Sequence, residues 1–317
     1  MSINNRTVIV ITGPTASGKT ALGVSLALAL GTEVVSADSM QLYRGMDIGS
    51  AKPTRGEMRG VPHHMIDVAD PGEDYSVSRW VEGAAACCDA LFAQGKTPVI
   101  VGGTGLYIES LLSGRDFSAA PGDSGVREAL GAEYDALGGA AFREKLRLID
   151  PERAEKLAPG DKKRLVRAME VYTLTGETIT AHDERTKALP PRYASRRFAL
   201  TWNDRETLYA RIRQRVDEMI AAGLFAEVER LLAAGLSDSC TAMQAIGYKE
   251  AVGAVRGEIT EAEAAERIRQ ESRRYAKRQL TWLRRDPSLF WIRFEKTPDM
   301  ALARRLSTGF LVRRGIE

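Results

Sequence analysis

Cysteine and histidine are scarce in this sequence of 317 residues, which contains three of each. Cys87 and Cys88 are adjacent, Cys240 lies far away, and no C-x-x-C pair occurs. His63 and His64 are neighbours and the third histidine is isolated, so no two histidines are spaced three or four residues apart. These spacings argue against a zinc site, and no metal other than magnesium is expected. We expect the cysteines to be small thiols that are buried or half-buried.

Long apolar runs are missing as well. No run approaches the ~18 residues that are needed to span a bilayer, and the longest candidate is Ala21 to Leu30. The first residues are polar and lack the charged-then-apolar pattern of a signal peptide. We therefore expect a cytoplasmic protein with no membrane partner. Because domains usually have about 100–200 residues, the length favours two domains or one large domain with an insertion.

Positive and negative charges nearly balance over the whole chain, which has a net charge of +3, but they do not balance locally. From Arg267 to Arg285 eight basic residues accompany a single acid, Glu271, and a second basic cluster occupies positions 162–167. Such local density is typical of a surface that binds phosphates. A solvated helix face without a partner is the alternative interpretation.

Apolar, β-branched runs alternate with helical patterns in the first third of the chain. The runs at 7–12, 33–37 and 98–102 predict strands, and the patterns at 19–30 and 75–94 predict helices. Continuous apolar strands that alternate with helices are typical of a parallel sheet covered on both faces. The sequence therefore predicts an α/β fold with a P-loop NTPase-like parallel sheet core.

The pattern changes after about Ser113, where the chain becomes helical, charged and punctuated by glycine. A strand is expected at 197–202, helices at 205–222, 225–234 and 261–285, and a last edge strand at 290–294. We divide the chain into a core of residues 1–112 and 192–317, which ends in basic helices, and a mostly helical insertion of residues 113–191.

A phosphate-binding motif follows the first predicted strand and opens the first predicted helix. Residues 13–20 read GPTASGKT and match G-x-x-x-x-G-K-[ST]. Glycines let backbone N–H groups turn inward, and the helix N-terminus adds about half a positive charge. Lys19 is expected to reach the outer phosphates, and the Thr20 hydroxyl is expected to bind Mg²⁺. The motif does not reveal which phosphate compound is bound.

Two further strand ends carry polar residues. Asp38 follows the second predicted strand and Thr104 follows the third, and ligands of open parallel sheets lie beyond such strand ends. From the residues alone, Asp38 is either a second-shell Mg²⁺ ligand or a general base that accepts a proton from a substrate. This pattern does not choose between the two.

Seven motifs, in order along almost the whole chain, resemble those of the tRNA dimethylallyltransferases, also called tRNA isopentenyltransferases or the IPP transferase family. They are GPTASGKT at 13–20, DSMQLY at 38–43, GMDIG at 45–49 with AKP at 51–53, PHH at 62–64 with Asp67 and Asp70-Pro71, VGGTGLY at 101–107, AIGYK at 245–249 and KRQLTW at 277–282. The stretch from Ser118 to Gly139 matches none of these motifs apart from Arg127.

The resemblance implies transfer of a dimethylallyl group from dimethylallyl diphosphate to N6 of adenosine 37, which is 3′ of the anticodon, in tRNAs reading codons that begin with U. Diphosphate leaves, and Mg²⁺ is the implied cofactor. Lys19, Asp38 and Thr104 are the implied catalytic residues, with Asp38 as the base and Thr104 positioning it. The diphosphate-binding residues are Gly13, Pro14, Thr15, Ala16, Ser17, Gly18, Lys19 and Thr20, together with one of Arg211 and Arg215.

The resemblance also implies contacts with the anticodon stem-loop of tRNA, made by a protein expected to be a monomer. These residues are Asp38, Ser39, Met40, Gln41, Thr104, Arg127, Lys163, Arg164, Leu165, Val166, Arg167, Gln244, Ala245, Ile246, Gly247, Tyr248, Lys249, Lys277, Arg278, Gln279, Leu280, Thr281, Trp282, Leu283 and Arg284. They include the basic clusters that charge alone singles out. Tyr275 and Trp282 are candidates for stacking on bases, but their spacing is equally typical of a core stripe.

Three other functions share some of these features. A P-loop small-molecule kinase would carry the same loop, but it gains nothing from the basic C-terminal helices. An enzyme that prenylates free adenine nucleotides should not need those helices either. A non-catalytic RNA-binding module has no use for Lys19, Thr20 and Asp38 in a phosphate cradle.

Overall fold

A computed structural model describes residues 6–114 and 124–313 of the chain. The chain divides into two compact units, and we call residues 1–112 with 193–317 the core unit and residues 113–192 the insertion unit. Each unit has its own hydrophobic core.

The core unit is built on a parallel sheet whose strand order is β3-β2-β4-β1-β5-β6. All strand pairs are parallel, which confirms the predicted α/β core. Strand β3 was not predicted, because its two residues are too few to show any periodicity. The strands are β1 (Thr7–Thr12), β2 (Val34–Ser36), β3 (His63–His64), β4 (Val99–Val101), β5 (Ala194–Trp202) and β6 (Phe290–Phe294).

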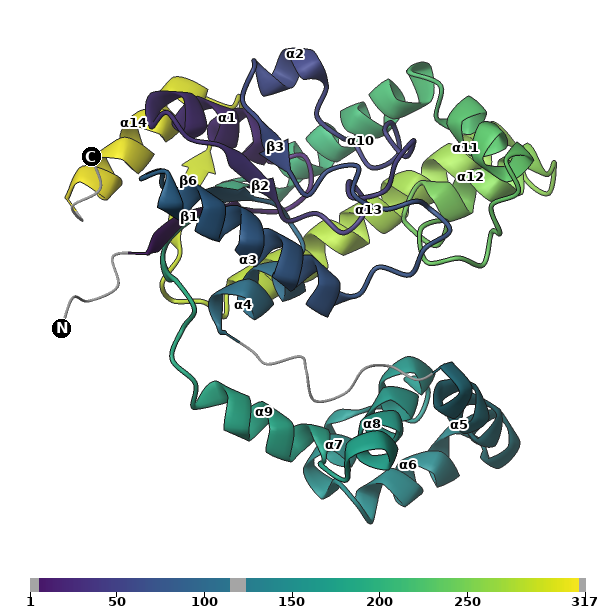
Figure 1. Cartoon of the computed structure of the whole chain (residues 1–317). Helices are drawn as coiled ribbons and strands as arrows, with labels where there is room; N and C mark the ends of the chain where they lie inside the picture. Colours follow the sequence, from purple (N-terminus) through teal and green to yellow (C-terminus); the bar gives the residue numbers. More distant parts are fainter. Residues whose placement is uncertain (1–5, 115–123, 314–317) are drawn as a thin grey trace. The chain divides into compact units, whose positions relative to one another are not determined.

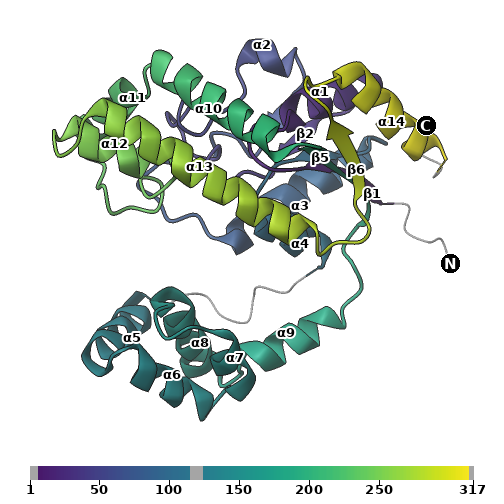
Figure 2. The same ribbon diagram turned by 180° about the vertical axis from the view of Figure 1, so that it is seen from behind.

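Helices cover both faces of the sheet, with α1 and α14 on one face and α3 and α4 on the other (Figure 1). The reverse view shows α10 and α13 running side by side (Figure 2), in agreement with their close contacts. The core-unit helices are α1 (Lys19–Ala29), α2 (Arg55–Met58), α3 (Val77–Ala93), α4 (Gly105–Leu112), α10 (Arg205–Ala221), α11 (Leu224–Ala233), α12 (Tyr248–Val255), α13 (Glu261–Leu283) and α14 (Met300–Val312).

The centre of the sheet is apolar on both faces because the four consecutive residues from Val8 to Ile11 of β1 are all apolar. Ile9, Ile11 and Phe198 join a buried cluster that includes apolar residues of α1, α10 and α14. On α3, Trp80 is fully buried, stacks on Tyr107 and donates its indole N–H to the Ser36 carbonyl. This packing fixes the carboxyl ends of β1, β2 and β4, where the candidate site lies.

The insertion unit is helical throughout its described residues, and no strand is found there. Its helices are α5 (Ser124–Leu137), α6 (Gly139–Arg147), α7 (Pro151–Lys156), α8 (Lys162–Thr175) and α9 (Ile179–Lys187). Its core gathers around Phe142, Leu146 and Leu165, all of which are fully buried. The helical character predicted for this region is therefore observed.

The cysteines are free, with Cys88 buried and the other two partly exposed, as the sequence predicted. Among the described residues, no helix is long and apolar enough to cross a membrane.

Candidate functional site

The phosphate loop connects the end of β1 to the first residue of α1, as predicted. Gly13 has a φ of +147°, and a Cβ there would lie 2.4 Å from the Leu200 carbonyl oxygen, so only glycine fits. Gly18 also has a positive φ, at +86°. The Ser17 hydroxyl is buried and lacks a hydrogen-bond partner within the described part of the chain. An orphaned donor at a helix N-terminus is what an anion-binding loop presents before its ligand arrives.

Lys19 lies at the centre of this loop and donates a hydrogen bond from Nζ to the Pro14 carbonyl oxygen at 2.7 Å. Burial, together with the positive charge of Arg215, lowers the pKa of Lys19 to about 7, although Asp38 opposes the shift. Burial also lowers the pKa of Arg215. Cations held close together at a cost in solvation favour the binding of a polyanion.

Arg211 and Arg215 both extend from α10 toward the phosphate loop. They line a cavity of about 530 Å³ together with Gly18, Lys19 and Thr20. Arg211 donates to Gln214 at 3.3 Å, but its buried Nε has no partner among the residues described. Both arginines therefore reach the cavity that the phosphate loop lines.

Asp38 and Thr104, predicted from two different strand ends, lie beside each other. The Thr104 hydroxyl accepts a hydrogen bond from Ser39 N at 3.1 Å, and Asp38 Oδ1 accepts one from Met40 N at 2.9 Å. The ends of β2 and β4 approach so closely that a Cβ at Gly102 would lie 2.1 Å from the Ala37 carbonyl oxygen. The backbone around Asp38 is thus fixed from both sides.

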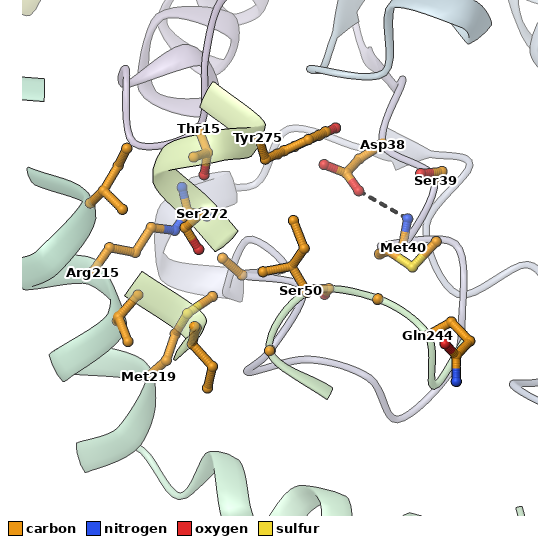
Figure 3. A pocket seen from close by; sticks show the side chains of 18 of the residues that line it. Thr15, Asp38, Ser39, Met40, Ser50, Arg215, Met219, Gln244, Ser272 and Tyr275 are labelled. Carbon is orange, nitrogen blue, oxygen red and sulfur yellow. Dashed lines mark hydrogen bonds between the residues drawn. The ribbon is translucent and has the colours of Figure 1, made fainter. Parts of the chain in front are cut away.

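A second cavity of about 300 Å³ adjoins the first (Figure 3). Its apolar wall comes mainly from α10, the segment before α12, and α13, through Ile212, Val216, Met219, Ile246 and Ile268. The two cavities share the lining residues Thr15, Asp38, Ser50, Ala51, Arg215, Met219 and Tyr275. We call them the cationic lobe and the apolar lobe of one hollow, with Asp38 where the two meet.

Tyr275 of α13 lines both lobes, and its hydroxyl points toward Asp38 (Figure 3). Burial raises the pKa of Tyr275 to about 12, with a further contribution from Asp38, so the hydroxyl stays protonated. It also lies within reach of the Thr104 hydroxyl. From the sequence, Tyr275 was a candidate for either base stacking or core packing, and its position beside Asp38 was not predicted.

Gln279, one turn further along α13, joins two loops of the site. Its side chain accepts a hydrogen bond from Thr15 N at 2.9 Å and donates one to the Gly103 carbonyl at 3.0 Å. Gln279 is only 7% exposed, so its side chain connects the phosphate loop to the β4–α4 loop. Contact between Gln279 and tRNA stays a prediction.

The other residues of α13 that were predicted to contact tRNA differ in their exposure to solvent. Lys277, Arg278, Thr281 and Arg284 are exposed, Leu280 is half-buried and Leu283 is buried. The Trp282 ring is half-buried and packs so closely on α4 that a Cβ at Gly105 would lie 2.7 Å from it. Lys277 and Arg284, seven residues apart, lie on one exposed side of the helix, whereas Arg278 also lines the apolar lobe.

The predicted segment 244–249 forms part of the apolar lobe. Gln244, Ala245, Ile246 and Gly247 line it, and Lys249 is exposed near Glu250 at 3.4 Å. Tyr248 is fully buried, and burial raises its pKa above the ordinary value, with Glu227 adding to the shift. Gln41 donates hydrogen bonds to the Ser50 and Ala51 carbonyls at 3.4 and 3.2 Å, and its contact with tRNA stays a prediction.

The predicted residues of the insertion unit lie on α5 and α8. Arg127 and Arg167 both form ion pairs with Glu170, at 3.1 and 2.8 Å, and that carboxylate is fully buried. Lys163 and Arg164 are exposed, whereas Leu165 and Val166 belong to the hydrophobic core. The structure contains no RNA, so the predicted contacts of these residues with tRNA stay predictions.

Comparisons with known proteins point to one family. Residues 41–286 match the model described as IPP transferase, and residues 6–69 match that of isopentenyl transferase. The chain is 46% identical over 283 residues to a tRNA dimethylallyltransferase of Desulforamulus reducens, covering 88% of this chain and 99% of that one. It is 47% identical over 285 residues to the tRNA dimethylallyltransferase of an Exiguobacterium species, covering 90% and 89%.

Solved structures agree with these relatives. The full-length tRNA isopentenylpyrophosphate transferase of Bacillus halodurans is similar with a TM-score of 0.72 and 37% identity, over 98% of both chains. A eukaryotic dimethylallyltransferase acting on tRNA is similar with a TM-score of 0.82 and 26% identity, over 98% of this chain and 81% of that one.

Proposed function

This chain belongs to the IPP transferase family, and we propose that it alkylates N6 of adenosine 37, 3′ of the anticodon, in tRNAs reading codons that begin with U. The broader activity follows from the family: the protein is an enzyme that transfers a dimethylallyl group to adenosine in tRNA. The observation that supports the detailed proposal best is the position of Asp38, which lines both lobes of one hollow.

The diphosphate of the donor occupies the cationic lobe in this proposal. Lys19, the backbone N–H groups of residues 16–20 and both Arg211 and Arg215 would bind it, because all of these residues line that lobe. Fixed cations that face the leaving group stabilise negative charge as it develops. The five-carbon prenyl group would then lie in the apolar lobe against Val216, Met219 and Ile246.

The reaction itself takes place beside Asp38. A bond forms between adenosine N6 and the allylic C1 of the donor, the bond between C1 and the ester oxygen breaks, and diphosphate departs. The Asp38 carboxylate accepts the proton that N6 loses, a contribution typically of about 10²–10⁴-fold. Thr104 positions Asp38 through its hydrogen bond with Ser39.

Magnesium fits this site as a partner of the diphosphate. Among the described residues, no three His, Cys, Asp or Glu side chains gather to hold a metal, but Thr20 lines the cationic lobe. Mg²⁺ is commonly held by one or two protein oxygens together with substrate phosphates. Thr20 would supply the protein ligand, and the bound ion would offset negative charge on the diphosphate.

We propose that the acceptor is the anticodon stem-loop, and the exposed cations of α13 support this by offering positive charge for its phosphates. The target base is normally stacked, so it must turn outward to reach the hollow. We propose that the protein acts as a monomer in the cytoplasm, where tRNA takes part in translation.

The Asp38→Asn variant tests the assignment of the base. It keeps the shape of the side chain and removes its ability to accept a proton, so we expect kcat to fall by about 10²-fold or more. Binding of tRNA and of dimethylallyl diphosphate, measured by filter retention and calorimetry, should stay within about threefold of the parent. Normal turnover per complex in Asp38→Asn would show that another group takes the proton.

A further inference from the structure

Glu227 of α11 is a buried acid that neither the motifs nor the proposed mechanism use. Its side chain is only 2% exposed. The carboxylate accepts hydrogen bonds from the backbone N–H groups of Asp47 at 3.0 Å, Ile48 at 3.0 and 3.1 Å, and Gly49 at 3.1 Å. A buried carboxylate is costly unless donors of this kind surround it, so the arrangement holds both partners firmly.

Glu227 also accepts a hydrogen bond from the Tyr248 hydroxyl at 2.7 Å. The Tyr248 ring packs directly on Gly49, where a Cβ would lie 2.5 Å from ring atom Cε2 and 2.6 Å from Cζ. The Gly49 backbone, the Glu227 carboxylate and the Tyr248 ring therefore form one closed arrangement.

The two segments that Glu227 joins both line the apolar lobe, and the first also lines the cationic lobe through Asp47 and Ile48. Gly49 leads into Ser50 and Ala51, which line both lobes, and Tyr248 directly follows the lining segment 244–247. Figure 3 shows Ser50 and Gln244 in this pocket with Asp38. Glu227 itself lines neither lobe, so its influence on substrate passes through the segments that it holds.

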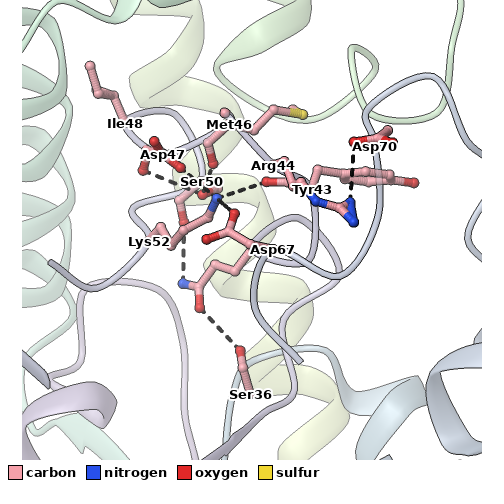
Figure 4. Close-up of polar contacts among 12 residues, drawn as sticks. Ser36, Tyr43, Arg44, Met46, Asp47, Ile48, Ser50, Lys52, Asp67 and Asp70 are labelled. Carbon is pink, nitrogen blue, oxygen red and sulfur yellow. Dashed lines mark hydrogen bonds and ion pairs between the residues drawn. The ribbon is translucent and has the colours of Figure 1, made fainter. Parts of the chain in front are cut away.

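The wall segment 47–51 is held by contacts with Lys52 as well as by Glu227. The Glu227 contacts are the ones that attach it to α11. Lys52 Nζ donates to the Tyr43 carbonyl at 2.8 Å and forms ion pairs with Asp47 and Asp67, both at 2.5 Å (Figure 4). Ala51 has a φ of +48°, a conformation that costs an ordinary residue free energy and persists only where the surroundings impose it. The segment is therefore held in one shape and does not relax freely.

We propose that Glu227 is a positioning residue that fixes the two walls of the apolar lobe, so that the prenyl C1 and adenosine N6 meet beside Asp38. The inference rests on the proposed function of this hollow. A misplacement of about 1 Å by a residue outside the reacting groups can reduce turnover by about 10²-fold. Asp47 and Ile48 also line the cationic lobe. The diphosphate in the proposed function is bound by the phosphate loop, Arg211 and Arg215, so donor binding should depend less on Glu227 than turnover does.

The test compares Glu227→Gln with Glu229→Gln, the same change at an exposed position of the same helix. The amide at position 227 places N–H groups against the N–H groups of 47–49. We expect kcat for tRNA prenylation to fall about 10–100-fold, with the Kd for dimethylallyl diphosphate within about threefold and the Glu229→Gln values unchanged. A purely structural role predicts a lower melting temperature but full activity per folded molecule, and that result would overturn the inference.

Tyr248→Phe provides a second variant that keeps the fold, since it removes only the hydroxyl donor to Glu227. We expect a smaller loss of kcat, about 3–10-fold, again without a change in diphosphate binding. Full activity in both Tyr248→Phe and Glu227→Gln would contradict the proposal. Asp38→Asn, assayed in parallel, tests the proposed function separately: if it is fully active while Glu227→Gln is impaired, the base assignment fails and the positioning role of Glu227 stands.

Discussion

At the scale of single residues, the site places cations where water is scarce. Lys19 and Arg215 face the same lobe, and burial lowers the pKa of both side chains. Lys19, Thr20, Asp38 and Thr104 were identified from a motif and from strand ends, because parallel strands present their carboxyl ends at one edge. Glu227 was not identified from the sequence, since an acid on a helix has the pattern of a solvated face, and its backbone partner Asp47 lies 180 positions away.

The pKa of Lys19 predicts a pH dependence of donor binding. In the free protein it lies at about 7, below the ordinary 10.5, so Lys19 loses its proton as the pH rises through 7. Diphosphate favours the ammonium form, so binding above pH 7 must take up a proton. We expect the Kd for dimethylallyl diphosphate to rise above pH 7, by at most about tenfold per pH unit.

Calorimetry at pH 8 in two buffers of different ionisation enthalpy measures this uptake directly. Lys19→Met is the control, because the ionisation of the ligand, near pH 6 for phosphate groups, is common to both proteins. The variant should bind weakly and take up no proton. Equal uptake by the parent and by Lys19→Met would show that Lys19 is not the group involved.

At the scale of elements, α13 presents two different faces. Tyr275 and Gln279 face the hollow and the loops around it, while Lys277 and Arg284 are exposed. The sequence predicted this helix and the longer strands because their periodicity extends over many residues. It missed α12 and α14, whose apolar positions lie within short or mixed stretches, and it could not say that Gln279 binds backbone atoms.

Replacing Lys277 and Arg284 by alanine tests the outer face of α13. If both contact phosphates, the affinity for tRNA should fall and the slope of log K against log salt should become shallower by about 1–2. The matched control is Arg304→Ala with Arg305→Ala, two exposed cations of α14. Unchanged affinity and slope in the α13 variant would remove this face from the tRNA interface.

At the scale of the whole molecule, the chain divides its chemistry between two compact units. The residues that line the hollow all belong to the core unit, while the basic residues of α5 and α8 belong to the insertion unit. In the insertion unit, the buried Glu170 holds Arg127 and Arg167 by ion pairs. The sequence could predict helices and cations there, but not the shared carboxylate.

The division between units predicts separable kinetic effects. Lys163→Ala with Arg164→Ala, both exposed on α8, should raise the KM for tRNA several-fold and leave the Kd for dimethylallyl diphosphate unchanged, because no residue of α8 lines the hollow. The exposed Lys156, with its partner Glu152 on α7, offers a control as Lys156→Ala. A changed donor Kd in the α8 variant would contradict the division.

The central claim is that the hollow joins a dimethylallyl group to the adenosine next to the anticodon. The most direct measurement incubates the protein with Mg²⁺, radiolabelled dimethylallyl diphosphate and an unmodified tRNA that reads a codon beginning with U. The same tRNA with guanosine at position 37, and AMP, are offered in parallel. We predict label in the first tRNA alone, at N6 of adenosine 37 on nuclease mapping. Label in AMP, or equal label in the guanosine-37 tRNA, would contradict this account.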